Sequence, residues 1–229
     1  MCGRINLWMS PAELAVVFEL FREPEWEPRY NLGPMQQILT VRQHPKGVVL
    51  AEPVQWGLVP AWSKSRMTSP PMNNARAETV SSKPSFSESF KRRRCLIPAN
   101  GFFEWKRLDT KSKQPWNIYR VDGQPLALAG IWDSWQSNDG DPLESCAVVT
   151  TEANSFMSKI HDRMPVILEK SDWKTWLDPE FTDVEELQRL LIPCPSELLT
   201  GTPVCSLVSN VKYDSPECVR PVAEHRTLF

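Results

Sequence analysis

The sequence predicts an α+β fold, with a mainly antiparallel, curved or barrel-like β-sheet core and peripheral helices. Short β-prone runs between Pro, Gly, Asn and Asp outnumber the helical patterns. These runs do not alternate with helices as the strands of a parallel sheet do. The chain of 229 residues contains 21 prolines but only 9 glycines. No internal repeat or long linker divides it, so we expect residues 1–229 to form a single domain.

Capping signals predict a few short helices. Ser10 is followed by Pro11 and Glu13, the pattern of a capping box that opens a helix. Thr182 and Glu185 repeat this spacing. The expected helices cover residues 10–21, 153–160, 171–177 and 182–191. The expected strands cover residues 37–42, 48–56, 95–98, 102–105, 116–121, 126–132, 146–150 and 204–207.

The composition excludes several classes of protein. Hydrophobic residues make up 41% and charged residues 24% of the chain, as in an ordinary globular protein. No run reaches the roughly 18–20 apolar residues of a membrane span, and no signal-peptide pattern opens the chain. We therefore expect a cytoplasmic protein that is not bound to a membrane. We also expect it to be a monomer. The six cysteines form no C-x-x-C pair, so we expect no disulfide framework, metal site or cofactor.

The net charge of −2 conceals an uneven distribution of charge. Residues 28–107 contain 13 Lys and Arg against four acidic residues, whereas residues 108–229 contain 11 against 19. Aromatic residues interleave the basic segment: Trp56, Trp62, Phe86, Phe90, Phe102, Phe103 and Trp105. Cations and aromatic rings together are typical of a groove for single-stranded nucleic acid. For the basic run at residues 91–94, a solvated loop face is the alternative interpretation.

Cys2 follows the initiator Met1, and aminopeptidases usually remove methionine before such a small residue. We therefore expect Cys2 to be the mature N-terminus. Its α-amine, with an unperturbed pKa of roughly 7.7–8, would then lie beside a thiol with an unperturbed pKa of roughly 8.5. Both nucleophiles are therefore accessible near neutral pH. The amine can form a Schiff base with an aldehyde, and the thiol can close on the imine carbon to give a five-membered thiazolidine.

Position 2 alone leaves two other interpretations of this cysteine. It can be an ordinary buried residue. Met-Cys-Gly also opens glutamine-dependent amidotransferases, N-terminal-nucleophile enzymes in which the thiol attacks an amide and the α-amine acts as base.

Six motifs of this chain occur in the order seen in one protein family. They are MCGR at 1–4, WGLVPAW at 56–62, NARAET at 74–79, RCLIP at 94–98, GFFEW at 101–105 and HDRMP at 161–165. The chain therefore resembles the SRAP (SOS response-associated peptidase) family, also called abasic-site processing proteins. The resemblance implies a single SRAP-like domain, and we expect the segment after about residue 170 to be structural.

The resemblance also implies an activity. Such a protein senses abasic sites in single-stranded DNA and forms a reversible covalent thiazolidine through Cys2, which shields the site from strand cleavage. The peptidase in the family name implies autoproteolytic processing, as release of Met1 or removal of the cross-link. No Ser-His-Asp constellation in the sequence indicates a general protease.

The resemblance assigns catalytic roles to four residues: Cys2, Asn74, Glu104 and His161. Aromatic neighbours of Glu104 can desolvate its carboxylate and raise its pKa toward neutrality, which suits a general acid/base. His161 titrates in the range needed to protonate the sugar oxygen during ring opening and cross-link reversal. Asn74 can orient the amine or the sugar oxygen without adding charge. Taken singly, a surface Glu, a structural His and a turn Asn are the alternatives.

Four further residues are candidates for DNA binding. Arg4, Arg76 and Arg163 carry fork-shaped guanidinium groups that suit the phosphates beside an abasic sugar. Trp62 can stack on a base or wedge the strand. Salt bridges with Glu78 or Asp162 are the alternative for the arginines, and core packing is the alternative for Trp62.

Two alternatives from other functional classes follow from the residues alone. An N-terminal-nucleophile amidohydrolase would release ammonia from glutamine. A non-catalytic single-stranded DNA-binding module, with an inert Cys2, would show salt-sensitive binding and no covalent product.

Overall fold

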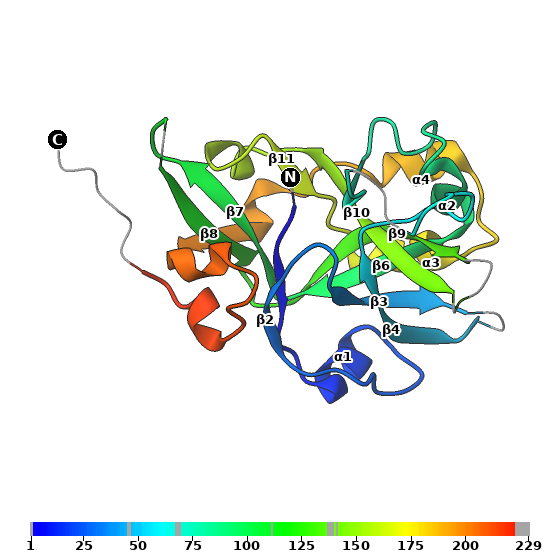
Figure 1. Cartoon of the computed structure of the whole chain (residues 1–229), viewed down its shortest axis with the longest axis horizontal. Coiled ribbons are helices and arrows are strands. Elements are labelled where there is room, and N and C mark those ends of the chain that lie inside the picture. Colours follow the sequence, from blue (N-terminus) through cyan, green and yellow to red (C-terminus); the bar gives the residue numbers. More distant parts are fainter. Residues whose placement is uncertain are drawn as a thin grey trace.

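Two mainly antiparallel β-sheets form the framework of the protein in our computed structural model (Figure 1). It describes residues 2–44, 47–66, 70–110, 112–136, 140 and 142–222. The first sheet has the order β12-β8-β7-β1-β2. Its strands are β1 (Ile5–Leu7), β2 (Arg29–Leu32), β7 (Gly101–Arg107), β8 (Lys113–Arg120) and β12 (Leu199–Pro203).

The second sheet closes on itself. Its strands are β3 (Gln37–Gln43), β4 (Val49–Trp56), β5 (Asn74–Arg76), β6 (Arg94–Ala99), β9 (Leu126–Trp135), β10 (Leu143–Glu152) and β11 (Arg163–Pro165). The order is β11-β10-β4-β3-β6-β9, and β9 also pairs with β10. Among the described residues of this sheet, only the pairings of β10 with β4 and β5 are parallel. The expected α+β fold with a mainly antiparallel, barrel-like core is therefore confirmed.

Seven of the eight expected strands are present, as β3, β4 and β6 to β10. The run at 204–207 is not a strand. The pairing with β8 ends where the Val204 N–H reaches the Pro115 carbonyl, because Pro115 has no N–H to donate in return. The chain then forms a 3-10 helix at Ser206–Ser209.

The described part of the chain has four short α-helices outside the sheets: α1 (Pro11–Val17), α2 (Ser87–Arg92), α3 (Lys170–Leu177) and α4 (Val184–Arg189). The capping box of α1 is confirmed, because Ser10 Oγ accepts the Glu13 N–H at 3.3 Å and Glu13 Oε2 accepts the Ser10 N–H at 2.8 Å. The helix nevertheless ends at Val17, before the expected Phe21. Glu19 adopts φ of 53°, a left-handed conformation that does not continue a helix.

Two other helix predictions need correction. The N-cap of α4 is Asp183 rather than Thr182, and its carboxylate accepts the N–H groups of the second and third helical residues. The helix expected at 153–160 is wrong, since only a 3-10 turn at Met157–Lys159 forms there. The Asn154 side chain accepts the Met157 N–H at 2.9 Å, an alternative to the backbone bonding of an α-helix.

Arg94 is a buried structural residue and not part of a solvated loop face. Only 3% of it is exposed, and burial lowers its pKa to about 10. Its guanidinium donates to the carbonyls of Trp176 at 2.7 Å, Phe90 at 2.9 Å and Phe181 at 2.9 Å, and also to those of Lys91 and Asp178. One side chain therefore ties α2 and β6 to α3 and the loop that follows it.

We expect Arg94→Leu to lower the free energy of unfolding by about 2–4 kcal/mol, because several buried carbonyls lose their donor. Urea denaturation measures the loss. Arg92→Leu is the matched control, since Arg92 is exposed at the end of α2 and should change stability by less than about 0.5 kcal/mol. Equal losses in the two variants would contradict this structural role.

No helix in the described residues is long and apolar enough to cross a membrane. Within the same residues, no group of three or more His, Cys, Asp and Glu side chains is arranged to hold a metal ion.

Candidate active site

Cys2 lies immediately before β1, where the chain approaches β7. Ile5 pairs with Phe102, and the Phe103 N–H donates to the Arg4 carbonyl at 2.9 Å. This antiparallel register carries Cys2 toward Glu104, and Figure 1 shows β1 drawn between β7 and β10. Cys2 is 0% exposed, so burial raises the pKa of its thiol, and the nearby Glu104 raises it further. Burial therefore disfavours the thiolate form that the sequence analysis expected to be accessible near neutral pH.

Glu104 is a carboxylate held in an apolar environment on β7. It is 3% exposed, and its chain neighbours Phe102 and Phe103 are fully buried. Burial raises the pKa of Glu104 to about 7. As the aromatic neighbours predicted, both protonation states are accessible near neutral pH, which is the property a general acid/base needs.

His161 completes a cluster with Glu104. Its Nε2 lies 4.0 Å from Glu104 Oε2. The Arg163 backbone N–H donates to His161 Nδ1 at 3.0 Å, so the neutral imidazole carries its proton on Nε2, on the side of Glu104. Burial lowers the pKa of His161, while Asp162, 2.9 Å from Nδ1, opposes that shift. Burial thus favours the neutral form of both groups, protonated Glu104 and unprotonated His161.

Asn74 begins β5 on the neighbouring edge. It pairs in parallel with Val148 of β10, and β10 also pairs with β11, the strand that follows His161. Asn74 Oδ1 is buried and has no hydrogen-bond partner among the described residues. An unpaired buried acceptor is costly to maintain, so its presence here fits a group that receives a hydrogen bond from a substrate.

Residues 1–211 match the model of the family described as SOS response associated peptidase (SRAP). The chain belongs to the SRAP family.

Individual relatives cover nearly the whole chain. The abasic site processing protein YoqW of Bacillus subtilis is 41% identical over 222 residues, which are 96% of this chain and 99% of YoqW. The abasic site processing protein YedK of Escherichia coli is 33% identical and covers 97% of this chain and 100% of its own length. A crystal structure of a Bacteroides thetaiotaomicron protein has a TM-score of 0.86 at 25% identity, covering 96% of this chain and 100% of that one.

Two of the arginines singled out from the SRAP motifs are already engaged within the fold. Arg163 forms two bonds to Glu78, at 2.6 and 3.1 Å, and another to the Thr150 carbonyl at 2.6 Å. This is the salt bridge named above as the alternative. Arg4 donates to Asn31 Oδ1 at 3.1 Å and to the Val208 carbonyl at 3.0 Å. The segment after residue 170 therefore helps to position the strand that carries Cys2.

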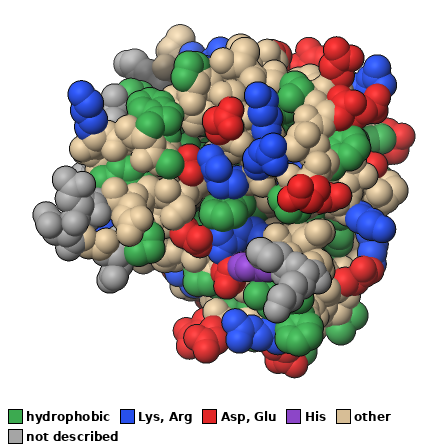
Figure 2. Space-filling view, turned by 90° about the vertical axis from the view of Figure 1, so that its right-hand side faces the viewer, with side chains coloured by type: hydrophobic (Ala, Val, Ile, Leu, Met, Phe, Trp, Pro, Cys, Tyr) green, Lys and Arg blue, Asp and Glu red, His purple; other side chains and the backbone are tan. Residues whose placement is uncertain are grey.

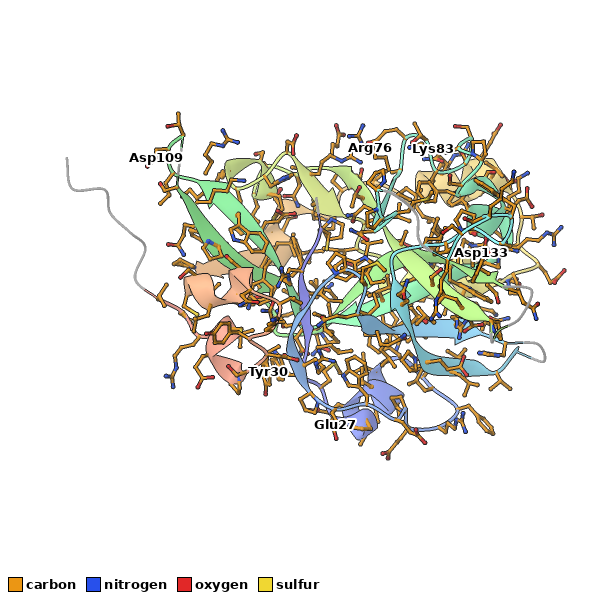
Figure 3. All side chains as sticks on the ribbon, viewed as in Figure 1. Glu27, Tyr30, Arg76, Lys83, Asp109 and Asp133 are labelled. Carbon is orange, nitrogen blue, oxygen red and sulfur yellow. The ribbon has the colours of Figure 1, made fainter. Side chains whose placement is uncertain are left out.

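Arg76 and Trp62 are accessible to a ligand. Arg76 is exposed, and Figure 3 shows it on the same side of the molecule as Lys83. Trp62 is 65% exposed, so it does not fill the core. The structure thus leaves these two SRAP-motif side chains in positions where phosphate contact and base stacking are geometrically open.

Three residues that the sequence analysis missed hold the loop of Trp62 in place. Asp133 Oδ2 accepts the Ala61 N–H at 3.0 Å, and Ser145 Oγ accepts the Val59 N–H at 2.8 Å. Trp135 Nε1 donates to the Ser63 carbonyl at 2.7 Å. The signal available in the sequence was a polar Asp133 inside the apolar run LALAGIWDSW.

The basic segment at residues 28–107 is partly neutralised by the acidic second half of the chain. Arg29 pairs with Asp214, Arg42 with Glu144, and Arg93 with Asp133. Figure 2 shows one face of the molecule, and on it the blue Lys and Arg side chains lie among red Asp and Glu side chains. The charge excess seen along the sequence is therefore not a uniformly basic surface on this face.

Proposed function

We propose that the protein senses abasic sites in single-stranded DNA and captures them as a reversible covalent thiazolidine through Cys2, after removal of Met1. The observation that carries this proposal is the cluster of buried Cys2 and Glu104 with the half-buried His161. The names of the relatives YoqW and YedK support abasic-site processing as the activity. Residues 1–229 act as one SRAP-like domain in this proposal, because both sheets contribute to a common core cluster.

The first step joins the Cys2 amine to the aldehyde of the ring-opened abasic sugar. The amine nitrogen attacks C1′ to give a carbinolamine, and loss of water then gives the imine. His161 supplies the proton that opens the sugar ring, and Asn74 orients the amine or the sugar oxygen. Glu104 exchanges the protons that the addition and the dehydration require.

The second step protects the strand. An iminium withdraws electrons and promotes β-elimination, which cuts DNA on the 3′ side of the sugar. The Cys2 thiol instead adds across the C=N bond: sulfur bonds to C1′, and the thiol proton leaves through Glu104 while nitrogen gains a proton. Because burial keeps the thiol protonated, a neighbouring base is required for this step. Reversal runs through the same groups in the opposite order.

Substrate contacts involve the remaining SRAP-motif residues. Arg76 contacts a phosphate and Trp62 stacks on or wedges a flanking base, since both side chains are exposed. Arg4 and Arg163 lie close to the DNA phosphates and keep their hydrogen bonds within the protein. In this way they position β1 and β11 against the DNA strand. Autoproteolytic processing enters only as release of Met1 or of the finished cross-link.

The test combines purified protein with single-stranded DNA that carries one abasic site, followed by a denaturing gel and intact mass to establish the absence of Met1. We expect a covalent band with the wild-type protein and none with Cys2→Ala. Ammonia release from glutamine would instead support the amidohydrolase. Salt-sensitive binding without a covalent band, when Cys2 is the free N-terminus, would support the binding module.

A further inference from the structure

A strained turn joins β2 to β3. The Gln36 N–H donates to the Gly33 carbonyl at 3.2 Å, which closes a four-residue turn with Pro34 and Met35 at its centre. Met35 adopts φ of 68°, in the left-handed region. A type II turn requires this conformation at its third residue, where glycine or asparagine is usual. Met35 therefore holds a long side chain at a position that favours a residue without one.

The Met35 side chain does little to stabilise the fold. The left-handed conformation is unfavourable for a residue with a Cβ, and the side chain is 43% exposed, so burial does not offset the strain. The Met35 N–H donates to the Trp56 carbonyl at 2.7 Å, which fixes the strained conformation. Backbone strain that is held in place in this way is typical of residues that contact a ligand.

Glu19 is the other described residue besides glycine with a positive φ, and it has an ordinary structural reason. It directly follows Phe18, the C-cap of α1, where a left-handed residue commonly ends a helix. Met35 lies at no helix end, so its side chain needs a different explanation.

The turn begins beside the strand that leads to Cys2. Leu32, the last residue of β2, pairs with Ile5, the first residue of β1. The next residue, Gly33, continues this register, because a Cβ on it would lie 3.4 Å from Arg4 Nε. The turn therefore lies at the end of β1 from which the chain runs back to Cys2.

A second contact places the Met35 side chain beside the segment of Asn74. A Cβ on Gly57 would lie 3.3 Å from Met35 Sδ and 3.3 Å from Asn73 Oδ1, so both atoms border the same space above Gly57. Asn73 directly precedes Asn74, the first residue of β5. Met35 is thus an exposed apolar side chain at the edge of the candidate active site, between the segments that carry Cys2 and Asn74.

We propose that Met35 packs against a nucleobase that flanks the abasic sugar and so contributes to binding of the DNA strand. This inference rests on the proposed function. The missing base leaves each flanking base without one of its stacking partners, and an apolar side chain at the edge of the site can cover that exposed face. The thioether of methionine is polarisable and makes favourable contacts with aromatic rings. Met35 has no proton to transfer, so its role is binding and not catalysis.

Equilibrium binding tests this contact without the chemistry of capture. The first probe is single-stranded DNA with one tetrahydrofuran residue, an abasic analogue without an aldehyde, between two adenines. In the second probe, tetrahydrofuran residues replace those two adenines as well. Fluorescence anisotropy measures the Kd of each. We expect Met35→Gly to weaken binding of the first probe about five- to tenfold and to leave binding of the second within twofold of wild type.

The melting temperature separates this role from a structural one. Met35→Gly should not lower it, because glycine adopts the left-handed conformation without strain. Met35→Leu keeps an apolar side chain and should bind the first probe within about twofold of wild type. Glu19→Gly is the matched control, since it makes the same backbone change at the end of α1 and should leave both Kd values unchanged.

Three results would overturn the assignment: a wild-type Kd of Met35→Gly for the adenine-flanked probe, an equal loss of affinity for both probes, or a clear fall in melting temperature. Because tetrahydrofuran cannot form an imine, these measurements decide the role of Met35 whether or not Cys2 forms the covalent product.

Discussion

Replacing Cys2 with serine is expected to turn protection of an abasic strand into cleavage of that strand. The serine variant keeps an N-terminal amine that can form the imine. It lacks the thiol, and a hydroxyl is a much weaker nucleophile toward the imine carbon. The iminium therefore persists, and β-elimination becomes the main outcome. We expect complete loss of the stable covalent band, together with a new scission product on a denaturing gel.

Cys205→Ser is the matched control for this change. Cys205 is a partly exposed cysteine far along the chain, with its sulfur 3.6 Å from the Glu217 carbonyl. It should cross-link and protect the strand like wild type. Borohydride reduction separates the steps, because it traps an imine as a stable amine. If Cys2→Ser gives neither scission nor a borohydride-trapped complex, the amine does not form the imine and the proposed first step is wrong.

Local sequence patterns predicted the long strands because each of them contains a run of β-prone residues between turn residues. The missed strands β1, β2, β5, β11 and β12 contain only three to five residues each. β5 and β11 are strands because both add to β10, whose pairing is set by residues far along the chain. Such pairing is a tertiary effect that no local window contains.

The site followed from the order of the motifs and not from their spacing. Cys2, Glu104 and His161 are far apart in sequence, and only the antiparallel pairing of β1 with β7 and the return of the chain before β11 bring them together. The partners of the arginines were harder to predict. Arg4 binds the Val208 carbonyl 204 positions away, and Arg163 binds Glu78 85 positions away. The same long-range pairing neutralises charges that look unbalanced along the chain.

Glu104→Gln is expected to slow both cross-link formation and its reversal by about 10²–10⁴-fold. The amide has nearly the shape of the carboxylate but can neither take up nor release a proton near neutral pH. Single-turnover time courses on abasic single-stranded DNA measure both rates. Glu88→Gln, at a highly exposed position of α2, is the matched control and should leave them unchanged.

The pH dependence of wild-type reversal provides a second readout. In reversal, Glu104 returns a proton to the Cys2 sulfur as the thiazolidine ring opens, so this step needs the acid form of Glu104. Because the pKa of Glu104 is about 7, the rate of reversal should fall as the pH rises through that value. In Glu104→Gln this inflection should disappear. A wild-type profile without an inflection near pH 7 would mean that another group supplies the proton.

Although Glu104→Gln should lower activity, it should raise the free energy of unfolding above neutral pH. The pKa of Glu104 is raised in the folded protein, from 4.5 to about 7, so the unfolded chain gives up its proton first as the pH rises. The contribution of Glu104 to the free energy of unfolding of the wild type is therefore fully present below pH 4.5 and is lost as the pH rises through 7. The largest loss is about 3 kcal/mol.

In Glu104→Gln this loss does not occur, because glutamine has no charge to desolvate. Urea denaturation should find Glu104→Gln more stable than wild type at pH 8 and nearly equal to it at pH 4, because a buried ionisable group that serves chemistry weakens the fold that holds it. A variant that loses activity and is also less stable at pH 8 would show that Glu104 acts mainly in packing.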